Sequence, residues 1–352
     1  MIVLGIESSC DETAAAVVVD GHTVRSSIVA SQYELHSMYG GVVPEIASRA
    51  HEQHIVRVID DAISQAGVSR SDIDAIAVGH RPGLIGALLV GLSAAKAMSW
   101  ALGVPMIGVD HVQAHLWAGS LDGEIPRYPA LGLVISGGHS SIYQMSSATD
   151  LVRLGATIDD AVGEAFDKVA AILGLGHPGG PRVDAAASMK DANDRAFGFP
   201  VSRLGKESLD FSFSGLKTAV LYEVKGKPAP PKMRGKPAIV VPPAPELTTR
   251  RVEDVAASFQ RAVERAVVLK LERAIEQTGA YETLIVGGGV AANTRLRAAL
   301  TVLAEKYSMK LVIPDMHYCI DNAAMIAGLG YKLIEQGRVD DLTLCAVPTT
   351  GC

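Results

Sequence analysis

The length, composition and charge of this chain limit the classes of protein it can be. It has 352 residues, of which 48% are hydrophobic and 20% are charged, an ordinary globular balance that supplies ample material for a core. At ~150 residues per domain, this length suggests about two domains. The formal net charge of -6 argues against a large non-specific nucleic-acid surface, although a local basic patch or a basic partner could still recruit RNA.

The cysteines and the N-terminus indicate a cytoplasmic protein. Cys10, Cys319, Cys345 and Cys352 form no C-x-x-C pair and no disulfide-like spacing, which suits a reducing cytosol. The first residues, MIVLGIESSCDET, reach Glu7 after a short apolar run and lack a charged n-region. They therefore predict neither a signal peptide nor a membrane span.

The first part of the chain predicts a β-hairpin followed by alternating helices and strands. Residues 1–20 contain a strand, the polar turn ESSCDET and a second strand. Apolar residues recur at helical spacing over 51–65, and DAIAVG (74–79) has the composition of a buried strand. The expected elements that follow are a Gly/Ala-rich helix over 84–102, a strand at VPMIGVD (104–110) and the helix that carries HVQAH (111–115).

After the proline-bounded stretch IPRYP (125–129), the pattern restarts. LGLVISGGHSSIYQM (131–145) again predicts strand, glycine turn and strand. Two such openings, each followed by helices and strands, predict a duplicated α/β fold. We place the boundary near 126–129, which gives lobes of residues 1–127 and 128–322. We expect the C-terminal helix within 323–352 to pack back onto the first lobe.

KGKPAPPKMRGKPAIVVPPAPE (225–246) stands apart as an inserted loop. Its proline content prevents a regular helix. The segment is either a solvated linker or a mobile basic arm for a phosphate backbone.

The HVQAH segment places His111 and His115 one helical turn apart, on one face. The hydrolytic version of this spacing, H-E-x-x-H, has its general base at the position of Val112. Asp321 is a candidate third ligand, although an isolated Asp before a helix is more often an N-cap. Two histidines and one carboxylate would leave open positions on a metal. From these residues alone, metal binding stays open, and His139 is a weaker candidate.

Two turns, one rich in glycine and one polar, could contact a substrate. ISGGHSS places Ser136, Gly137 and Gly138 where a strand turns, so that successive N–H groups could bind an anion. A β-turn that needs positive φ would have the same sequence. Asp11 and Glu12 in ESSCDET could act as a base, bind an ion or cap a turn. Neither turn matches the P-loop pattern.

Two further residues, Asn293 and Asp184, could contact a nucleotide. LIVGGGVAANTRL (284–296) predicts a strand, three glycines and a helix N-terminus, with Asn293 as a base or ribose contact or an ordinary helix-turn residue. LGLGHPGGPRVDAAA (173–187) ends near Asp184, a plausible ribose acceptor. Asp167 and Lys168 lie on an otherwise apolar helix, where charges that face solvent are the commoner explanation.

Nine segments in this order resemble the motifs of one family. They are IESSCDETAAAVV, GGVVPEIASRAHEQHI, HVQAH, ISGGHS, AVGEAFDKVA, HPGGPRVD, DFSFSGLKTAV, GGGVAANTRLR and CIDNAAMIAG. Together they closely resemble the TsaD family of tRNA threonylcarbamoyltransferases, from the first residues to about Gly328. Each motif alone is modest, but their joint specificity is high.

The resemblance implies a fold and a reaction. The fold would be that of the actin, sugar-kinase and heat-shock ATPase superfamily, with two ribonuclease-H-like lobes. The reaction would transfer a threonylcarbamoyl group from threonylcarbamoyl-AMP to N6 of the tRNA adenosine 3′ of the anticodon, in tRNAs that read codons beginning with A. AMP would leave. Rival interpretations are a related metal-dependent carbamoyltransferase, a kinase of the same superfamily or an inactive TsaB-like subunit.

The resemblance also implies site residues. His111, His115 and Asp321 would hold one divalent metal ion, with Fe²⁺ expected and Zn²⁺ as the alternative. The residues expected to bind the adenine nucleotide or threonylcarbamoyl-AMP are Val134, Ile135, Ser136, Gly137, Gly138, Asp167, Gly180, Asp184 and Asn293. Beyond the resemblance, we expect Asp11 or Glu12 to accept or relay the N6 proton, because both lie in the turn that faces the cleft.

Partners follow from the same resemblance. The family acts on tRNA together with a TsaB-like paralogue, which pairs through helices, and a TsaE-like ATPase, while a separate synthase supplies threonylcarbamoyl-AMP. The acidic charge of this chain fits such dependence, since tRNA binding would be shared among subunits. No membrane contact is expected.

Overall fold

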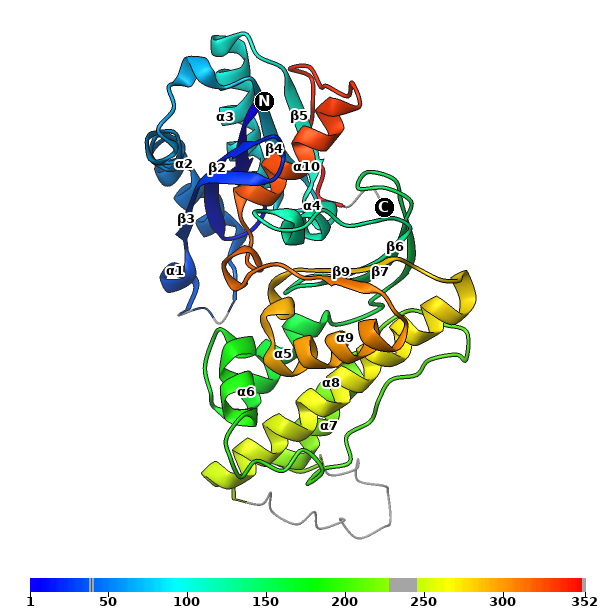
Figure 1. Cartoon of the computed structure of the whole chain (residues 1–352). Helices are drawn as coiled ribbons and strands as arrows, with labels where there is room; N and C mark the ends of the chain where they lie inside the picture. The colour runs from blue at the N-terminus through cyan, green and yellow to red at the C-terminus, as the bar shows by residue number, and fades with distance from the viewer. Residues whose placement is uncertain (38, 40, 228–245, 350–352) are drawn as a thin grey trace, which may run out of the picture.

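The computed structural model describes residues 1–37, 39, 41–227 and 246–349. Most of the segment predicted as an inserted loop, residues 228–245, lies outside the described residues, so its role stays a prediction. Figure 1 shows two lobes, with the N-terminal strands in one and the long helix α8 in the other.

The first sheet has five strands in the order β3-β2-β1-β4-β5. Their bounds are β1 Ile2–Glu7, β2 Glu12–Val19, β3 Thr23–Ser31, β4 Ala75–Arg81 and β5 Met106–Asp110. β1 pairs antiparallel with β2 and parallel with β4, while β5 extends the sheet parallel to β4. The hairpin predicted over residues 1–20 is therefore confirmed.

The second sheet repeats this arrangement. Its order is β10-β9-β6-β7-β8, with β6 Ala130–Ile135, β7 Ser140–Met145, β8 Leu151–Ala156, β9 Thr283–Gly287 and β10 Lys310–Val312. β6 pairs antiparallel with β7 and parallel with β9, as β1 does with β2 and β4. The predicted duplication of the fold is confirmed.

The helices are distributed over the faces of both sheets. Their bounds are α1 Tyr33–Ser37, α2 Pro44–Ala66, α3 Ile85–Leu102, α4 His111–Trp117, α5 Val162–Leu173, α6 Gly179–Ala187, α7 Ser214–Lys225, α8 Thr249–Thr278, α9 Thr294–Lys306 and α10 Ala323–Glu335. Among the described helices, α3 alone is long and apolar enough to cross a membrane, judged by length and composition only. In this fold α3 packs against β4 and α2.

Alternation along the strands decides which helix covers which face of the first sheet. One face of the sheet packs against α2 and α3. It is formed by Leu4 and Ile6 of β1, Ala15 and Val17 of β2, and Ile76 and Val78 of β4. Val3 faces α10, together with Ala14 and Ala16 of β2 and Ala75 and Ala77 of β4. These small residues let α10 approach closely, since a Cβ on Gly5 would lie 2.1 Å from the carbonyl oxygen of Ala323. The C-terminal helix thus packs on the first sheet, although it follows the second sheet in the chain.

Helix α4 lies at the junction of the two lobes. It follows β5 of the first sheet, and its Val112 and Leu116 pack against Val134 and Tyr143 of the second sheet. The opposite face of the second sheet is covered by α5, α7, α8 and α9. Residues of α4 that do not face the second sheet can therefore meet residues from the first lobe and from the segment before α10.

Candidate active site

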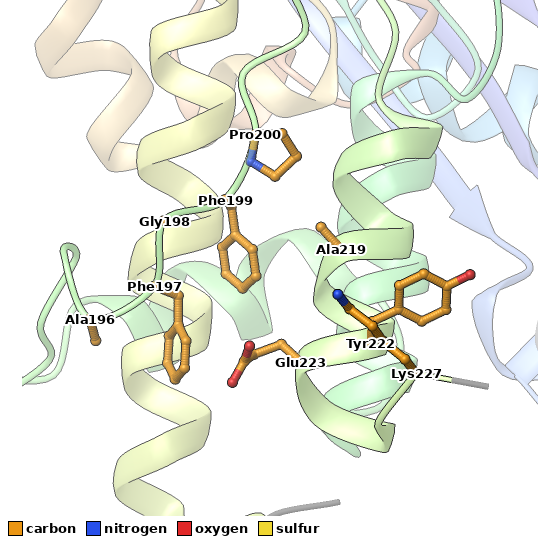
Figure 2. A pocket seen from close by; sticks show the side chains of 9 residues that line it. All are labelled: Ala196, Phe197, Gly198, Phe199, Pro200, Ala219, Tyr222, Glu223 and Lys227. Atoms are coloured by element: carbon orange, nitrogen blue, oxygen red, sulfur yellow. The ribbon is translucent and has the colours of Figure 1, made fainter. Parts of the chain in front are cut away.

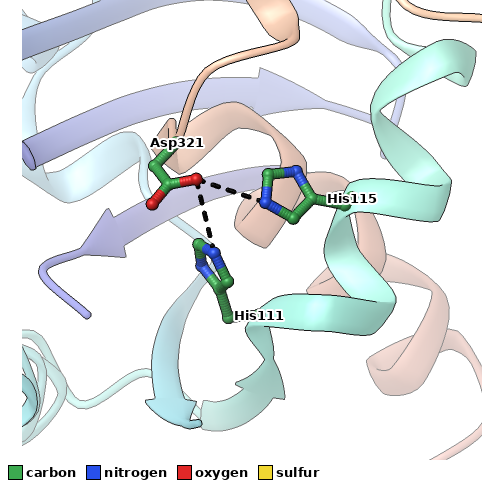
Figure 3. Close-up of side chains that lie close together, drawn as sticks. All are labelled: His111, His115 and Asp321. Carbon is green, nitrogen blue, oxygen red and sulfur yellow. Dashed lines mark ion pairs between the residues drawn. The ribbon is translucent and has the colours of Figure 1, made fainter. Parts of the chain in front are cut away.

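His111 and His115 lie one turn apart on α4, and both face Asp321 (Figure 3). The distance to Asp321 Oδ1 is 3.4 Å from His111 Nε2 and 3.2 Å from His115 Nε2. Both histidines are buried, and their rings meet edge to face with centroids 4.7 Å apart. The structure brings together three residues that could hold a metal ion.

The separations and bonding of these side chains fit a divalent metal. Two ligand atoms bound at ~2.1 Å lie ~3.0–3.4 Å apart when they subtend about 90–109° at the metal, which brackets the distances from Asp321 to the histidines. Both ring nitrogens of His115 are buried, and neither makes a hydrogen bond of good geometry. A buried polar atom without a partner is uncommon. A metal would supply the missing partner.

The electrostatics of the triad point the same way. Burial opposes protonation of His111, but the carboxylates of Asp321 and Glu7 outweigh it and raise the pKa of His111 well above its usual value. Burial opposes the charge of Asp321, yet His111 and His115 hold the pKa of Asp321 well below its usual value. Burial lowers the pKa of His115. The site therefore favours positive charge, which a cation would provide.

Glu7 is a site residue that the sequence did not reveal. Its side chain is fully buried, and its Oε2 lies 2.9 Å from His111 Nδ1. Its Oε1 accepts a hydrogen bond from the Ser9 backbone N–H at 2.5 Å. A carboxylate on the far nitrogen of a metal-binding histidine fixes the ring and its tautomer. The one sequence signal was a Glu at the end of a buried strand, where a charge needs a partner.

The competing explanation for Asp321, a helix N-cap, is wrong. Asn322 caps α10, because its side-chain oxygen accepts from the Met325 N–H at 3.0 Å. Asp110 takes the same role on α4 and accepts from Val112 and Gln113 N–H groups. Asp321 is therefore free of capping and turns toward the histidines.

The turn between β1 and β2 places Asp11 and Glu12 beside the triad. Burial, together with the negative charges of Asp321 and Asp11 and a hydrogen bond with Asp11, raises the pKa of Glu12 to about 9. Ser31 Oγ donates to Glu12 Oε1 at 3.3 Å. A pKa this high keeps Glu12 protonated near neutral pH, beside the side chain of Asp11.

The turn at Ser136–Gly138 does not need its glycines for backbone conformation. Gly137 and Gly138 are not among the glycines with positive φ, so the alternative explanation by a positive-φ turn is wrong. A Cβ on either would meet nothing within 4 Å. Val134 and Ile135, at the end of β6, are buried behind this turn. The open side of the turn has room for a ligand.

His139 forms part of the same turn. Its N–H donates to Ser136 Oγ at 3.2 Å, and its carbonyl accepts from the Ser136 N–H at 2.8 Å. Burial and the nearby His111 and His115 lower the pKa of His139 to about 4. Within the described residues, the cluster able to hold a metal does not include His139.

Asp167 contacts Gly179, the residue before Gly180, at the start of α6. Asp167 Oδ1 accepts from the Gly179 N–H at 2.7 Å. A Cβ on Gly180 would meet nothing within 4 Å. Lys168, on the next position of α5, forms ion pairs with Asp160 and Glu164 rather than pointing freely to solvent.

Asp184 and Asn293 form a separate hydrogen-bonded group. Asn293 Nδ2 donates to Asp184 Oδ1 at 3.2 Å, and Asn293 Oδ1 caps α9 by accepting from the Leu296 N–H. Gln260 and Thr294 also donate to the Asp184 carboxylate. Asn293 thus has the ordinary helix-terminal role, and its contact with a nucleoside stays a prediction.

A surface hollow of about 550 Å³ lies away from these groups, between the 196–200 segment and α7 (Figure 2). Phe197 and Phe199 stack along it with ring centroids 5.8 Å apart. It contains none of the predicted site residues.

The profile of the TsaD family, described as tRNA N6-adenosine threonylcarbamoyltransferase, matches residues 23–328. The chain belongs to the TsaD family. The TsaD relative from Trichlorobacter lovleyi is 48% identical over 99% of this chain and 96% of its own length. The one from Thermosipho africanus is 45% identical over 99% of both chains.

Two solved structures share this fold at lower sequence identity than the two TsaD relatives above. HypF of T. kodakarensis aligns with a TM-score of 0.58 at 16% identity, over 95% of this chain and 48% of that one. The activator of the 2-hydroxyisocaproyl-CoA dehydratase from Clostridium difficile aligns with a TM-score of 0.52 at 13% identity, over 96% and 97%. These likenesses concern the fold alone. The expected superfamily fold is confirmed.

Proposed function

We propose that this chain transfers the threonylcarbamoyl group of threonylcarbamoyl-AMP to N6 of the tRNA adenosine 3′ of the anticodon, in tRNAs that read codons beginning with A. Membership of the TsaD family over most of the chain supports this activity. The observation that carries the site is the His111, His115 and Asp321 cluster next to the Asp11–Glu12 turn.

The reaction requires alignment, charge stabilisation and a proton acceptor. The adenine N6 is a poor nucleophile, and the AMP leaving group activates the carbamoyl carbon. As the new C–N bond forms, the C–O bond to the AMP phosphate breaks and the N6 proton leaves. We assign the acceptance or relay of this proton to the Asp11–Glu12 pair, which shares a hydrogen bond beside the triad.

The metal would be held by His111, His115 and Asp321, with Fe²⁺ as our proposal and Zn²⁺ as the alternative. When bound, it would act as a Lewis acid toward a carboxylate or phosphate oxygen of the donor. Val112 replaces the general base of hydrolytic sites with the same spacing. This substitution supports transfer rather than hydrolysis.

The donor would lie against the second lobe. We assign its binding to the 134–138 segment, Asp167, Gly180, Asp184 and Asn293. Support comes from the open space beside Gly137, Gly138 and Gly180, where backbone N–H groups can approach an anion. The Asp184–Asn293 pair presents hydrogen-bonding groups suited to a nucleoside.

The direct test is transfer with synthetic threonylcarbamoyl-AMP and unmodified tRNA in the presence of partner subunits, followed by mass spectrometry of the nucleosides. We expect modified adenosine, and we expect Asp11→Asn or Glu12→Gln to lower kcat by roughly 10²–10⁴-fold. Glu52→Gln, an exposed carboxylate of α2, is the matched control and should behave as wild type. Full transfer rates in both site variants would show that the turn is not the proton acceptor.

The rival functions make different predictions in the same assay. The likeness to HypF concerns the fold alone. It therefore supports neither of the rival enzymes, a related carbamoyltransferase or a superfamily kinase. Either would leave tRNA unmodified. An inactive TsaB-like subunit would lack the metal pair, so one metal ion per chain that is lost in His111→Ala would exclude it.

We further propose a cytoplasmic complex with a TsaB-like paralogue and a TsaE-like ATPase, with the donor supplied by a separate synthase. Support comes from α3, where Ile85 and Leu89 are each 49% exposed and Trp100 is 77% exposed. These residues share one side of the helix, and exposed apolar faces of this kind bind partner helices. tRNA binding shared among subunits also suits the net charge of -6.

The partner surface can be tested by substitution. Because the apolar contact would be lost, Leu89→Ser with Trp100→Ser should weaken binding of the TsaB-like subunit at least tenfold, measured by calorimetry. Val302→Ser removes another exposed apolar side chain, 64% exposed on α9, and should not change the affinity. Equal affinities for all three proteins would place the interface elsewhere.

A further inference from the structure

His51 belongs to the GGVVPEIASRAHEQHI segment, to which the proposed reaction assigns no role. It lies on α2, and its side chain is fully buried. Its Nδ1 is 2.8 Å from Thr13 Oγ1, and its Nε2 is 3.0 Å from the carbonyl oxygen of Cys10. One ring therefore contacts the residues on both sides of Asp11 and Glu12.

The two contacts determine the tautomer of His51. A carbonyl oxygen can only accept, so Nε2 carries the hydrogen and donates to Cys10. Burial lowers the pKa of His51, so the ring is neutral and Nδ1 accepts from the Thr13 hydroxyl. Both nitrogens are then satisfied, and the ring cannot turn without breaking both hydrogen bonds.

The alternation of β2 connects this ring to the proposed proton acceptor. Thr13, Ala15 and Val17 share one side of β2, and Ala15 and Val17 pack in the cluster with α2. Glu12 lies on the opposite side with Ala14, which packs in the cluster with α10, and it senses the charge of Asp321. A ring that fixes Thr13 from one side of the strand therefore sets the direction of Glu12 on the other.

Other contacts hold single positions of the turn, such as Ser8 Oγ with the Ala87 carbonyl at 2.8 Å and Ser9 Oγ with His111 Nδ1 at 3.2 Å. The Gln32 N–H donates to the Asp11 carbonyl at 3.0 Å, and the Leu84 N–H donates to the Ser9 carbonyl at 2.8 Å. Ser31 reaches Glu12 from β3 at 3.3 Å. Among these contacts, only His51 contacts both the residue before Asp11 and the residue after Glu12.

We propose that His51 is a positioning residue that clamps the Asp11–Glu12 turn in the orientation needed to take the N6 proton. This inference rests on the proposed function of that turn. The ring of His51 is fully buried and both of its nitrogens are engaged by Thr13 and Cys10, so its loss should act on kcat rather than on substrate affinity. A displacement of the acceptor by about 1 Å can cost ~10²-fold in rate.

The first experiment separates kcat from KM in the complete transfer assay with partner subunits. His51→Leu should lower kcat roughly 10- to 100-fold, with KM for threonylcarbamoyl-AMP and metal content unchanged. His51→Gln should restore much of the rate, because its amide nitrogen can donate to the Cys10 carbonyl as Nε2 does. His54→Gln, an exposed histidine on the same helix, is the matched control and should be unaffected.

A second pair of variants guards against misfolding of the His51 proteins. Thr13→Val removes the hydroxyl with little change of shape, and Thr13→Ser keeps it. The proposal requires a lower kcat in Thr13→Val and near-normal kcat in Thr13→Ser. Equal rates in both, or a rise in KM and a loss of metal instead of a lower kcat, would overturn it.

A double-mutant cycle separates this inference from the proposed function. In the background of whichever turn variant slows transfer, Asp11→Asn or Glu12→Gln, His51→Leu should cause little further loss. Independent, multiplicative losses would mean that His51 acts elsewhere and would overturn the inference alone. If neither turn variant slows transfer, the function proposed for the turn is wrong and the role of His51 falls with it.

Discussion

The two histidines of HVQAH differ in what surrounds the ring nitrogen that faces away from Asp321. Nδ1 of His111 meets Glu7 and Ser9 at 2.9 and 3.2 Å. Nδ1 of His115 is buried without a hydrogen bond. His111 is therefore oriented by a buried carboxylate, whereas His115 is held by the packing of α4 between the lobes.

Removal of a ligand should abolish metal binding, while removal of the orienting carboxylate should weaken it. We expect His115→Ala to lower the metal content from near one to below about a tenth per chain, and Glu7→Gln to weaken affinity ~10–100-fold. Metal analysis after dialysis and competition with a chelator measure both. His54→Ala is the control, since this histidine is exposed on α2. Unchanged metal content in His115→Ala would contradict the assignment of ligands.

Lys270 gives a prediction about stability. It is buried on α8 and donates to the carbonyls of Arg203 and Ser208 at 2.9 and 2.7 Å. Burial, with repulsion from Arg273, lowers the pKa of Lys270 to about 8. Between this value and the ordinary pKa of about 10.4, the unfolded chain binds more protons, so the free energy of unfolding should rise with pH.

The rise in the free energy of unfolding with pH should depend on Lys270. We expect urea unfolding to show a smaller increase in stability between about pH 7.5 and pH 9.5 for Lys270→Met than for the wild type. The two carbonyls keep Arg273 as a donor in the variant. Parallel pH dependence in the two proteins would show that folding does not lower the pKa of Lys270.

At the scale of elements, the N-terminus of α5 supports the Ser136–Gly138 turn. The Gly163 and Glu164 N–H groups donate to the carbonyls of Ser136 and Gly137, each at 3.2 Å. Gly163 permits this approach, because a Cβ there would lie 2.6 Å from the Ser136 carbonyl oxygen and 2.8 Å from Gly137 Cα. These atoms are backbone and cannot move aside without moving the turn.

Gly163→Ala should therefore displace the turn. We expect KM for threonylcarbamoyl-AMP to rise roughly tenfold or more, and stability to fall by about 1–3 kcal/mol. Steady-state kinetics and urea unfolding measure the two effects. Gly198→Ala is the control, since a Cβ there meets nothing within 4 Å and the residue lies beside the distant surface hollow. An unchanged KM in Gly163→Ala would show that the Ser136–Gly138 turn does not bind the donor.

At the scale of the whole molecule, the lobes also meet through Tyr33 and His177. Tyr33 on α1 donates its hydroxyl to the carbonyl of His177, just before α6, at 2.5 Å. The two rings stack with centroids 5.7 Å apart. This contact joins the first lobe to the segment that carries Gly179 and Gly180.

Loss of this hydrogen bond should loosen the lobes. Because a typical hydrogen bond contributes about 1 kcal/mol, Tyr33→Phe should raise KM for the donor about fivefold and increase the radius of gyration measured by X-ray scattering. Tyr222→Phe, at the distant surface hollow, is the control for the substitution. An unchanged KM and radius would mean that this contact does not govern the lobes.

The sequence by itself determined the elements and their duplication. The strand–glycine turn–strand pattern of 131–145 and the apolar spacing in 51–65 are local, and a single hairpin or helix displays them without its neighbours. The family motifs are local too, so HVQAH and ISGGHS indicated the chemistry. The ligand role of His111 and His115, the donor residues and the lobe boundary stay predictions.

Only the tertiary structure decided how these pieces meet. Small residues on one face of the first sheet let α10 pack closely. Asp321, just before α10, thereby lies against His115 of α4. Burial of Glu7 against His111 and of His51 against Thr13 depends on strands and helices distant in the chain. Such contacts leave no periodic trace in the sequence, because they depend on the distance between elements and not on the spacing within one.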